Sequence, residues 1–288
     1  MLRQLNALKA LRRNLRNQVQ ILYASGQNAE ALELCDRLAR AYDEPGDSEE
    51  LASLLCNEAA ILHKRGEIGA AIALLKKIEI LSRASRNLSG LAESLGLQAY
   101  VLSEHGDIKA SADLYDEAEG LWRRVDNLDG LQNTLLNHAQ LLASSGQSNP
   151  AMGLLKEQEQ ICRKLGHLRG LQASLCAQAL ILQSNSDLEA ALALHREQEG
   201  ISRQLQDPEG IAKCLINQAL VHAARGEACA ASDLAEQAVR TAHEHGLALL
   251  ERQVRALQER IRQELFPGGS APKGVDRGFI VSPRSSPS

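Results

Sequence analysis

The sequence predicts an all-α protein, an α-solenoid of six tandem helix hairpins with a capping helix at its C-terminal end. The first observation is a forty-residue period, which is typical of repeat proteins whose units pack only on their neighbours. The units begin at Leu11, Leu51, Leu91, Leu131, Leu171 and Ile211. The second is composition: aromatic residues make up 2% of the chain, whereas a β-sheet core would favour aromatic and β-branched residues. The third is the helical spacing of apolar residues within each unit.

The first helix of each unit is predicted from positions 1, 5, 9 and 12, numbered from the leading apolar residue. These positions share one face of a helix of about four turns. Position 5 is Leu in every unit, and position 9 is Ala in all units except the first, which has Val19. Position 12 is Leu except in the last unit, where His222 takes its place.

A turn follows at position 16, where every unit but one has glycine. The glycines are Gly26, Gly66, Gly106, Gly146 and Gly226, and the exception is Ser186. Glycine suits a left-handed residue after a helix, so Ser186 should make its turn slightly less favourable. Position 17 is Asp, Glu or Gln in every unit, and acidic groups there favour the start of the next helix.

The second helix is predicted from position 21, which is Ala or Ser111, and from position 24, which is always Leu. Small residues at positions 9 and 21 let the two helices approach closely, while Leu at positions 5 and 24 fills the remaining space. Pro45 and Pro208 stand between units, where a helix has to end. Pro150 falls in the first turn of a second helix, where a missing N–H does little harm. Each unit is therefore a helix hairpin.

This order of small residue, Gly-acidic turn, small residue and Leu resembles the tetratricopeptide repeat over residues 11–250. The usual unit has about 34 residues, and the forty-residue units are similar to the longer kind found in kinesin light chains. The resemblance implies a right-handed solenoid, with the extra residues in the connections between units. The implied units are 11–50, 51–90, 91–130, 131–170, 171–210 and 211–250. The chain departs from the family at position 5, where Leu replaces a large aromatic residue, and it keeps the second-helix aromatic only at Tyr115.

Both ends of the chain depart from the repeat. Residues 1–10 align with the end of a second helix, so we interpret them as the remnant of a preceding unit. A fragment, an alternative start and a decayed first repeat would each explain it. Residues 251–265 predict a capping helix with one apolar stripe, formed by Val254, Leu257, Ile261 and Leu265. Residues 266–288 are rich in Gly, Pro and Ser, which predicts a disordered tail.

Charge and cysteine content narrow the function classes. The 32 basic and 36 acidic residues give a formal charge of −4 and form no basic stripe, so nucleic acid is not an expected partner. No run approaches the roughly 20 apolar residues of a membrane span. The six cysteines form no C-x-x-C pair, which favours a reducing compartment and a cytoplasmic protein. The alternative is a mitochondrial protein, because residues 1–29 carry basic residues and no acidic one.

Catalytic and metal-binding motifs are missing from the sequence. It contains no nucleophile elbow, phosphate-binding loop, zinc-protease motif or dinucleotide fingerprint. His243 and His245 are two residues apart, so on a helix they point away from each other and make a poor metal site. We therefore expect no enzyme activity and no cofactor.

The family resemblance places the first helices along a concave groove, with positions 3, 6, 10 and 13 facing into it. It also gives a role to the Asn residues of position 7, since an amide both donates to and accepts from a peptide backbone; the alternative is that they bridge neighbouring repeats. The candidate groove residues are Asn17, Asn57, Tyr100, Leu136, Asn137, Gln140, Leu180, Ile216, Asn217 and Leu220.

Positions 6 and 10 become more apolar along the chain. Leu180, Ile216 and Leu220, with Leu136 nearby, predict an exposed apolar floor that would bind a hydrophobic peptide or helix. The alternative is that the capping helix or the tail fills this floor. The sequence thus predicts a protein-interaction scaffold that holds a segment of a partner protein. A second hypothesis is the terminal sensor arm of a larger switch protein, autoinhibited by its own tail.

Overall fold

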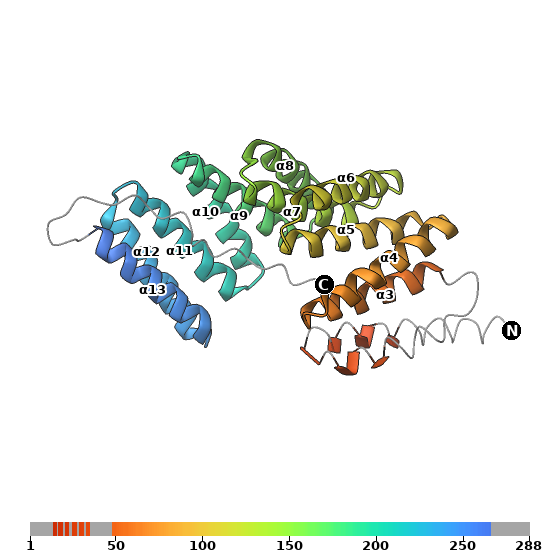
Figure 1. Ribbon diagram of the computed structural model, residues 1–288. Helices are drawn as coiled ribbons and strands as arrows, with labels where there is room; N and C mark the ends of the chain where they lie inside the picture. The colour runs from red at the N-terminus through yellow and green to blue at the C-terminus, as the bar shows by residue number, and fades with distance from the viewer. Residues whose placement is uncertain are drawn as a thin grey trace. The chain divides into compact units, whose positions relative to one another are not determined.

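The computed structural model describes residues 48–265 throughout and, before them, residues 14, 15, 17–19, 21, 22, 25–27, 29–31, 33 and 34 (Figure 1). The predicted helix remnant at 1–10 and the predicted tail at 266–288 lie outside these residues. Residues 48–265 form helices joined by short turns and contain no strand, which confirms the all-α prediction. None of the described helices is long and apolar enough to cross a membrane.

The helices from residue 48 onward begin at intervals of twenty residues. They are α3 (Ser48–Lys64), α4 (Ile68–Ser85), α5 (Leu88–Glu104), α6 (Ile108–Arg124), α7 (Leu128–Ser144), α8 (Ser148–Leu165), α9 (Leu168–Ser184), α10 (Leu188–Gln204), α11 (Pro208–Ala224), α12 (Ala228–Glu244) and α13 (Ala248–Leu265). The odd-numbered helices are the first helices of the predicted hairpins, and the even-numbered ones are the second helices. Each helix has 17 or 18 residues.

The turns within and between hairpins have the same form. Gly66 and Gly106, at position 16, have φ of +79° and +84°, as the glycine pattern predicts. Residues twenty positions further on, such as Arg86 with φ +56°, are left-handed as well. In both kinds of turn the next amide bonds back to the preceding helix, as Glu67 N does to Leu62 O at 2.9 Å.

The expectation that the connections between units hold the extra residues is therefore wrong. Only Arg86 and Asn87 separate α4 from α5. The forty-residue unit is long because both of its helices are long.

Side chains cap many of the helices at their N-termini. Asp107 and Asp187, at position 17, accept hydrogen bonds from the amides of Ala110 and Ala190. At the turns between hairpins the corresponding caps are Asn87, Asn127 and Asp207, each bonded to the amide of a glycine three residues later. These caps satisfy amides that have no partner within their own helix.

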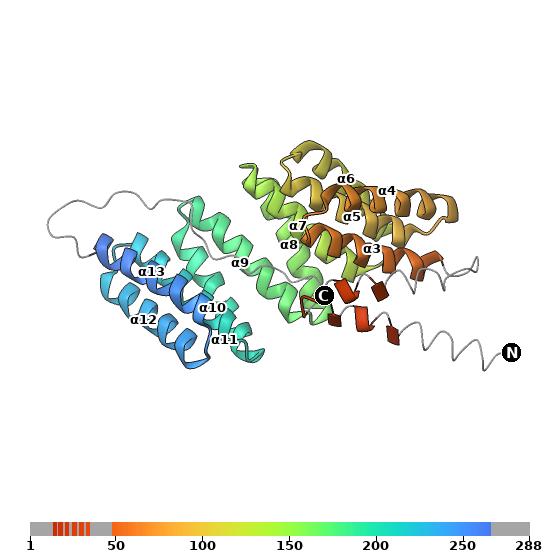
Figure 2. The ribbon, with the colours of Figure 1, turned by 60° about the horizontal axis from the view of Figure 1, so that its bottom comes forward.

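The described helices fall into two compact units, α3–α7 and α8–α13. Within each unit, successive helices pack side by side as antiparallel hairpins (Figure 2). Position 5 is buried, as at Leu95 and Leu175, and so are positions 9 and 21, as at Ala99 and Ala191. Leu at position 24 is half-buried, and the residue after it, such as Leu155, is fully buried. Both positions thus contribute to the core.

The C-terminal helix α13 starts at Ala248 and packs against α11 and α12. It begins twenty residues after α12, so it occupies the place of the first helix of one more hairpin. Its predicted apolar stripe is buried at Val254, Leu257 and Ile261. The outer face of the helix carries Arg and Glu side chains, as a terminal cap requires.

Candidate functional site

Position 6 does not line an open groove. Leu136 and Ile216 are buried, as are Cys56 and Cys176 at the same position. First helices of successive hairpins pack against each other, as α3 does on α5 and α11 on α13, and the side chain at position 6 turns into this packing. Positions 7 and 10 point further outward in the first unit, where Asn137 is half-buried and Gln140 is exposed.

The expected apolar floor near the C-terminus is covered. Ile216 is 0% exposed and Leu220 is 6% exposed. Both belong to one apolar cluster with Val254, Leu257 and Ile261 of α13. The prediction that Leu136, Ile216 and Leu220 form an exposed floor is therefore wrong. For Ile216 and Leu220 the alternative applies, in which the capping helix covers the apolar side chains. Leu180 is half-buried.

The Asn residues of position 7 differ in exposure along the chain. Asn17 is exposed, Asn57 and Asn137 are half-buried, and Asn217 is buried. Neither amide atom of Asn217 has a hydrogen-bond partner among the described residues, nor does Nδ2 of Asn57. The alternative role of bridging neighbouring repeats is thus not visible at either residue. An unpaired buried amide costs about 1–3 kcal/mol, so both sites keep unused hydrogen-bonding capacity.

Among the predicted groove residues, Tyr100 is held by side-chain contacts with Glu104 and His63. Its ring is 38% exposed, and its hydroxyl donates to Glu104 Oε1 at 2.8 Å. The other oxygen of Glu104 lies 3.0 Å from Nε2 of His63 on α3. The rings of His63 and Tyr100 meet edge to face, with centroids 5.6 Å apart. Sequence reasoning missed His63 and Glu104, because they stand in columns where other units have unrelated residues.

A second feature that sequence reasoning missed is a row of buried and partly buried hydrogen bonds between hairpins. In each case a Glu at position 29 of a second helix accepts from position 8 of the next first helix. The pairs and their distances are Glu79–Gln98 at 3.0 Å, Glu119–His138 at 2.8 Å, Glu159–Gln178 at 2.7 Å and Glu199–Gln218 at 2.5 Å. The same four Glu residues pair with an Arg four residues later in their own helix. We call this repeated set the Glu ladder.

One pair of the Glu ladder, Glu119 and His138, forms a group of potential metal ligands together with Asp116. It is the one such group found among the described residues. Nδ1 of His138 lies 2.8 Å from Glu119 and 3.9 Å from Asp116. Gln takes the place of His138 in the other three pairs. The hydrogen bond to Glu119 is therefore sufficient to explain His138 as part of the ladder.

Buried cysteines and one buried histidine have shifted pKa values that arise from burial. Burial raises the pKa of Cys176 to about 11 and that of Cys214 to about 12. Burial also lowers the pKa of His195 to about 4. None of these groups lies on the exposed face of the first helices, so they belong to the core and not to a reactive site.

Comparisons with known proteins show the fold. No protein-family model and no curated protein matches the sequence. A signal transduction ATPase with a tetratricopeptide repeat sensor, from Pyrococcus horikoshii, superimposes with a TM-score of 0.74 at 10% identity, over 86% of this chain and 38% of that chain.

Two further solved structures show the same repeat architecture. A putative kinesin light chain from Podosopora anserina, described as having TPR-like repeats, gives 0.53 at 17% identity, over 67% and 95% of the two chains. A Rap protein complexed with competence and sporulation factor gives 0.61 at 10% identity, over 87% and 74%.

Proposed function

We propose that this tetratricopeptide-like repeat protein is a noncatalytic scaffold that binds an extended segment of a partner protein along α3, α5 and α7. The observation that carries the proposal is a set of polar side chains on the first helices α3, α5 and α7, in which Tyr100 and Gln140 are exposed and Asn57 and Asn137 are half-buried. We call these four residues the polar groove set. Their side chains offer both donors and acceptors, which an extended backbone requires.

Tyr100 is the central residue of the polar groove set. Its hydroxyl is held by Glu104, so the exposed ring has a fixed orientation before any partner binds. A rigid aromatic side chain gives contact area at little cost in conformational entropy. Asn137, which is half-buried, and Gln140, which is exposed, add amide donors and acceptors on the neighbouring helix α7.

The preferred ligand differs from the hydrophobic peptide expected from the sequence. Leu136, Ile216 and Leu220 are buried, so a partner would reach them only after the helices separate. The accessible residues of these positions on α3, α5 and α7 are mostly polar, with half-buried Ala60 and Leu97 as apolar ones. A polar segment with few apolar side chains therefore fits this surface better. In support of the proposal, the similarly folded Rap protein is seen in complex with a factor.

The test compares partner capture by two triple variants of the full chain. Tyr100→Ala, Asn137→Ala and Gln140→Ala remove the centre of the polar groove set. Lys109→Ala, Asp113→Ala and Gln160→Ala remove exposed side chains from second helices and serve as the matched control. Proteins captured by the wild type and the control but lost by the groove variant, as read by quantitative mass spectrometry, support the proposal. Capture that is unchanged in the groove variant, with an unchanged circular dichroism spectrum, contradicts it.

A second candidate function is the sensor arm of a larger switch protein. It is favoured by the likeness to the sensor-bearing ATPase, of which this chain matches 38%. If the tail occupies the binding face, deletion of residues 267–288 should raise the affinity for a captured partner. An affinity that the deletion leaves unchanged counts against autoinhibition.

A further inference from the structure

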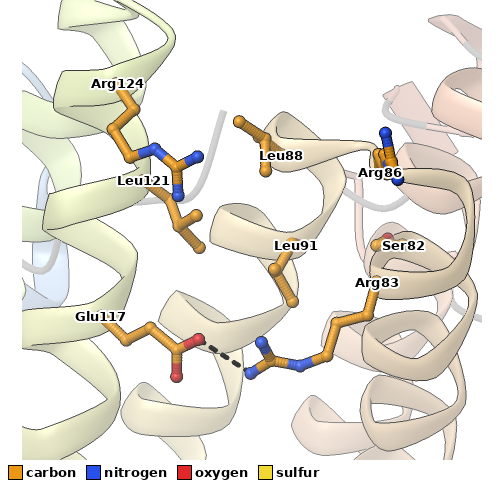
Figure 3. A pocket seen from close by; sticks show the side chains of 8 residues that line it. All are labelled: Ser82, Arg83, Arg86, Leu88, Leu91, Glu117, Leu121 and Arg124. Atoms are coloured by element: carbon orange, nitrogen blue, oxygen red, sulfur yellow. Dashed lines mark hydrogen bonds and ion pairs between the residues drawn. The ribbon is translucent and has the colours of Figure 1, made fainter.

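A pocket of about 480 Å³ opens in the first unit, away from the polar groove set (Figure 3). It lies between the C-terminal halves of the second helices α4 and α6, above the start of α5. Its apolar wall consists of Leu88 and Leu91 from α5 and Leu121 from α6. The volume is in the range of sites that take up a small ligand or a few side chains.

One side of the pocket is closed by an ion pair between its two second helices. The guanidinium of Arg83 donates to Glu117 Oε1 at 2.8 Å, across the gap between α4 and α6 (Figure 3). Arg83 also donates to Glu79 of the Glu ladder at 3.0 Å. These two hydrogen bonds, that to Glu117 first, raise the pKa of Arg83. Arg83 is therefore already committed to protein carboxylates.

Arg86 and Arg124 are the uncommitted cations of the pocket. Both are exposed, and neither side chain makes an ion pair or a hydrogen bond among the described residues. Arg83 is paired with both Glu117 and Glu79, so the two positive charges that the pocket leaves without a carboxylate partner are those of Arg86 and Arg124. Ser82 also lines the pocket, and its buried Oγ has no hydrogen-bond partner in the part of the chain that the structure describes. The pocket thus combines two unpaired positive charges with an apolar wall.

The second unit provides an internal comparison at the same place between α8, α9 and α10. There Arg163 pairs with Glu197 at 2.6 Å, as Arg83 does with Glu117. The apolar positions are also kept, as Leu168, Leu171 and Ile201. The residues that differ are Cys162, Gly166 and Gln204, which stand where the first unit has Ser82, Arg86 and Arg124. The fold therefore does not require the two free cations.

The backbone conformation of Arg86 also indicates that the fold does not require an arginine at this turn. Its φ is +56°, a left-handed conformation in which the second unit has Gly166 at +67°. A side chain in this conformation costs about 1 kcal/mol relative to glycine. The side chain of Arg86 has no partner among the described residues that would offset this cost.

We propose that this pocket binds a phosphorylated serine or threonine that is flanked by an apolar residue on a partner polypeptide. A phosphate monoester carries a charge of about −1.5 to −2 at neutral pH, which matches the two unpaired guanidinium groups of Arg86 and Arg124. Guanidinium groups bind phosphate oxygens through paired N–H donors. A carboxylate would neutralise only one of these two guanidinium groups. The leucine wall then receives the neighbouring apolar side chain. This proposal does not depend on the polar groove set.

Binding of labelled peptides to the full chain tests the proposal. The probes are three fluorescein-labelled heptapeptides, Ala-Ala-Leu-X-Leu-Ala-Ala, in which X is phosphoserine, glutamate or serine, and the readout is fluorescence anisotropy at about 0.15 M salt. We expect the phosphoserine peptide to bind at least tenfold more tightly than the other two. Arg86→Gln with Arg124→Gln should weaken it at least tenfold. Gln is a residue that the chain itself has at both places, as Gln206 and Gln204, so the variant should fold.

Two further variants sharpen the test. Arg169→Gln with Arg240→Gln removes the same charge from exposed sites on α9 and α12 and should bind like the wild type. Gly166→Arg with Gln204→Arg copies the two cations into the second unit, and it should raise the calorimetric stoichiometry from one peptide to two. Equal affinity for the three peptides, or full affinity in the Arg86→Gln, Arg124→Gln variant, overturns the proposal. Inorganic phosphate that binds as tightly as the phosphopeptide overturns the polypeptide as the ligand, because the leucine wall would then contribute nothing.

Discussion

Gly130, the third residue of α7, shows how closely successive hairpins approach. A Cβ atom at this position would lie 2.6 Å from Cδ2 and Cε2 of Trp122 and 2.8 Å from its Cε3. The ring has little freedom to move, because it is 7% exposed and its Nε1 donates to Thr134 Oγ1 at 3.1 Å. Gly130→Ala therefore forces either the ring or the start of α7 to shift.

The magnitude follows from two opposing effects. Overpacking of a core costs about 1–3 kcal/mol, while replacing a helical Gly by Ala returns about 0.5–1 kcal/mol. The expected net effect of Gly130→Ala is a destabilisation of up to about 2.5 kcal/mol. Gly120 in α6 is the matched control, because a Cβ there meets nothing within 4 Å. Gly120→Ala should stabilise the protein by about 0.5–1 kcal/mol.

Urea unfolding measured by fluorescence distinguishes the two variants. Trp122 is the single Trp of the chain, so its emission reports on this contact directly, and circular dichroism reports on all the helices. We expect Gly130→Ala to lower the urea midpoint and to shift the emission of the folded state, whereas Gly120→Ala should raise the midpoint. A Gly130→Ala variant that is as stable as Gly120→Ala would refute the argument from close approach.

The remaining predictions concern the turns, the Glu ladder and the buried groups. Ser186→Gly should raise the urea midpoint by an amount equivalent to about 1 kcal/mol, since φ at Ser186 is +65°. Gln178→Leu should lower stability by about 1–2 kcal/mol because Glu159 loses a donor, whereas Gln178→His should keep most of it. Burial lowers the pKa of His195 from 6.5 to about 4, so the unfolded chain binds the proton first and stability falls as the pH drops through this window; His195→Leu should flatten that fall in the thermal midpoint. Among the described cysteines, Cys229 is the exposed one, and mass-spectrometric mapping should find it alkylated before the buried ones.

The helices and their turns were predictable because their causes are local. Apolar spacing such as Leu91, Leu95 and Ala99 specifies one helical face within a single helix. A glycine such as Gly106 specifies a left-handed residue through its own φ preference. Neither inference needs information about a distant part of the chain.

The groove was harder to predict because it depends on how each helix is rotated about its own axis. Positions 6 and 7 are adjacent in sequence, and on a helix they point about 100° apart. A modest error in rotation therefore exchanges a buried residue for an exposed one. Leu136 and Asn137 illustrate this, since the first is buried and the second is half-buried. Family resemblance assigned the groove to the first helices, which stays a prediction, and position 6, which it placed in that groove, is buried at Leu136 and Ile216.

The Glu ladder left a partial trace in the sequence. Each Glu and its Arg are four residues apart, as Glu79 and Arg83 are, and this spacing typically indicates a solvent-exposed helix pair. The residue that donates the hydrogen bond between hairpins to this Glu lies 19 residues away in the next first helix, as Gln98 does for Glu79. Since that partner is Gln in some hairpins and His138 in another, no single residue type marks the column.

The turns between hairpins also contain a left-handed residue, but the glycine pattern of the sequence does not predict all of them. These turns require left-handed residues as strictly as the turns within hairpins do, yet they contain Arg86, Asp126 and Gln206 as well as Gly166 and Gly246. A cost of about 1 kcal/mol per side chain is small enough for an array to tolerate, so the glycine column is incomplete. The same tolerance lets the chain place a functional side chain at such a turn. Arg86 is the instance in which the side chain faces a pocket, and there the strain is coupled to unused charge.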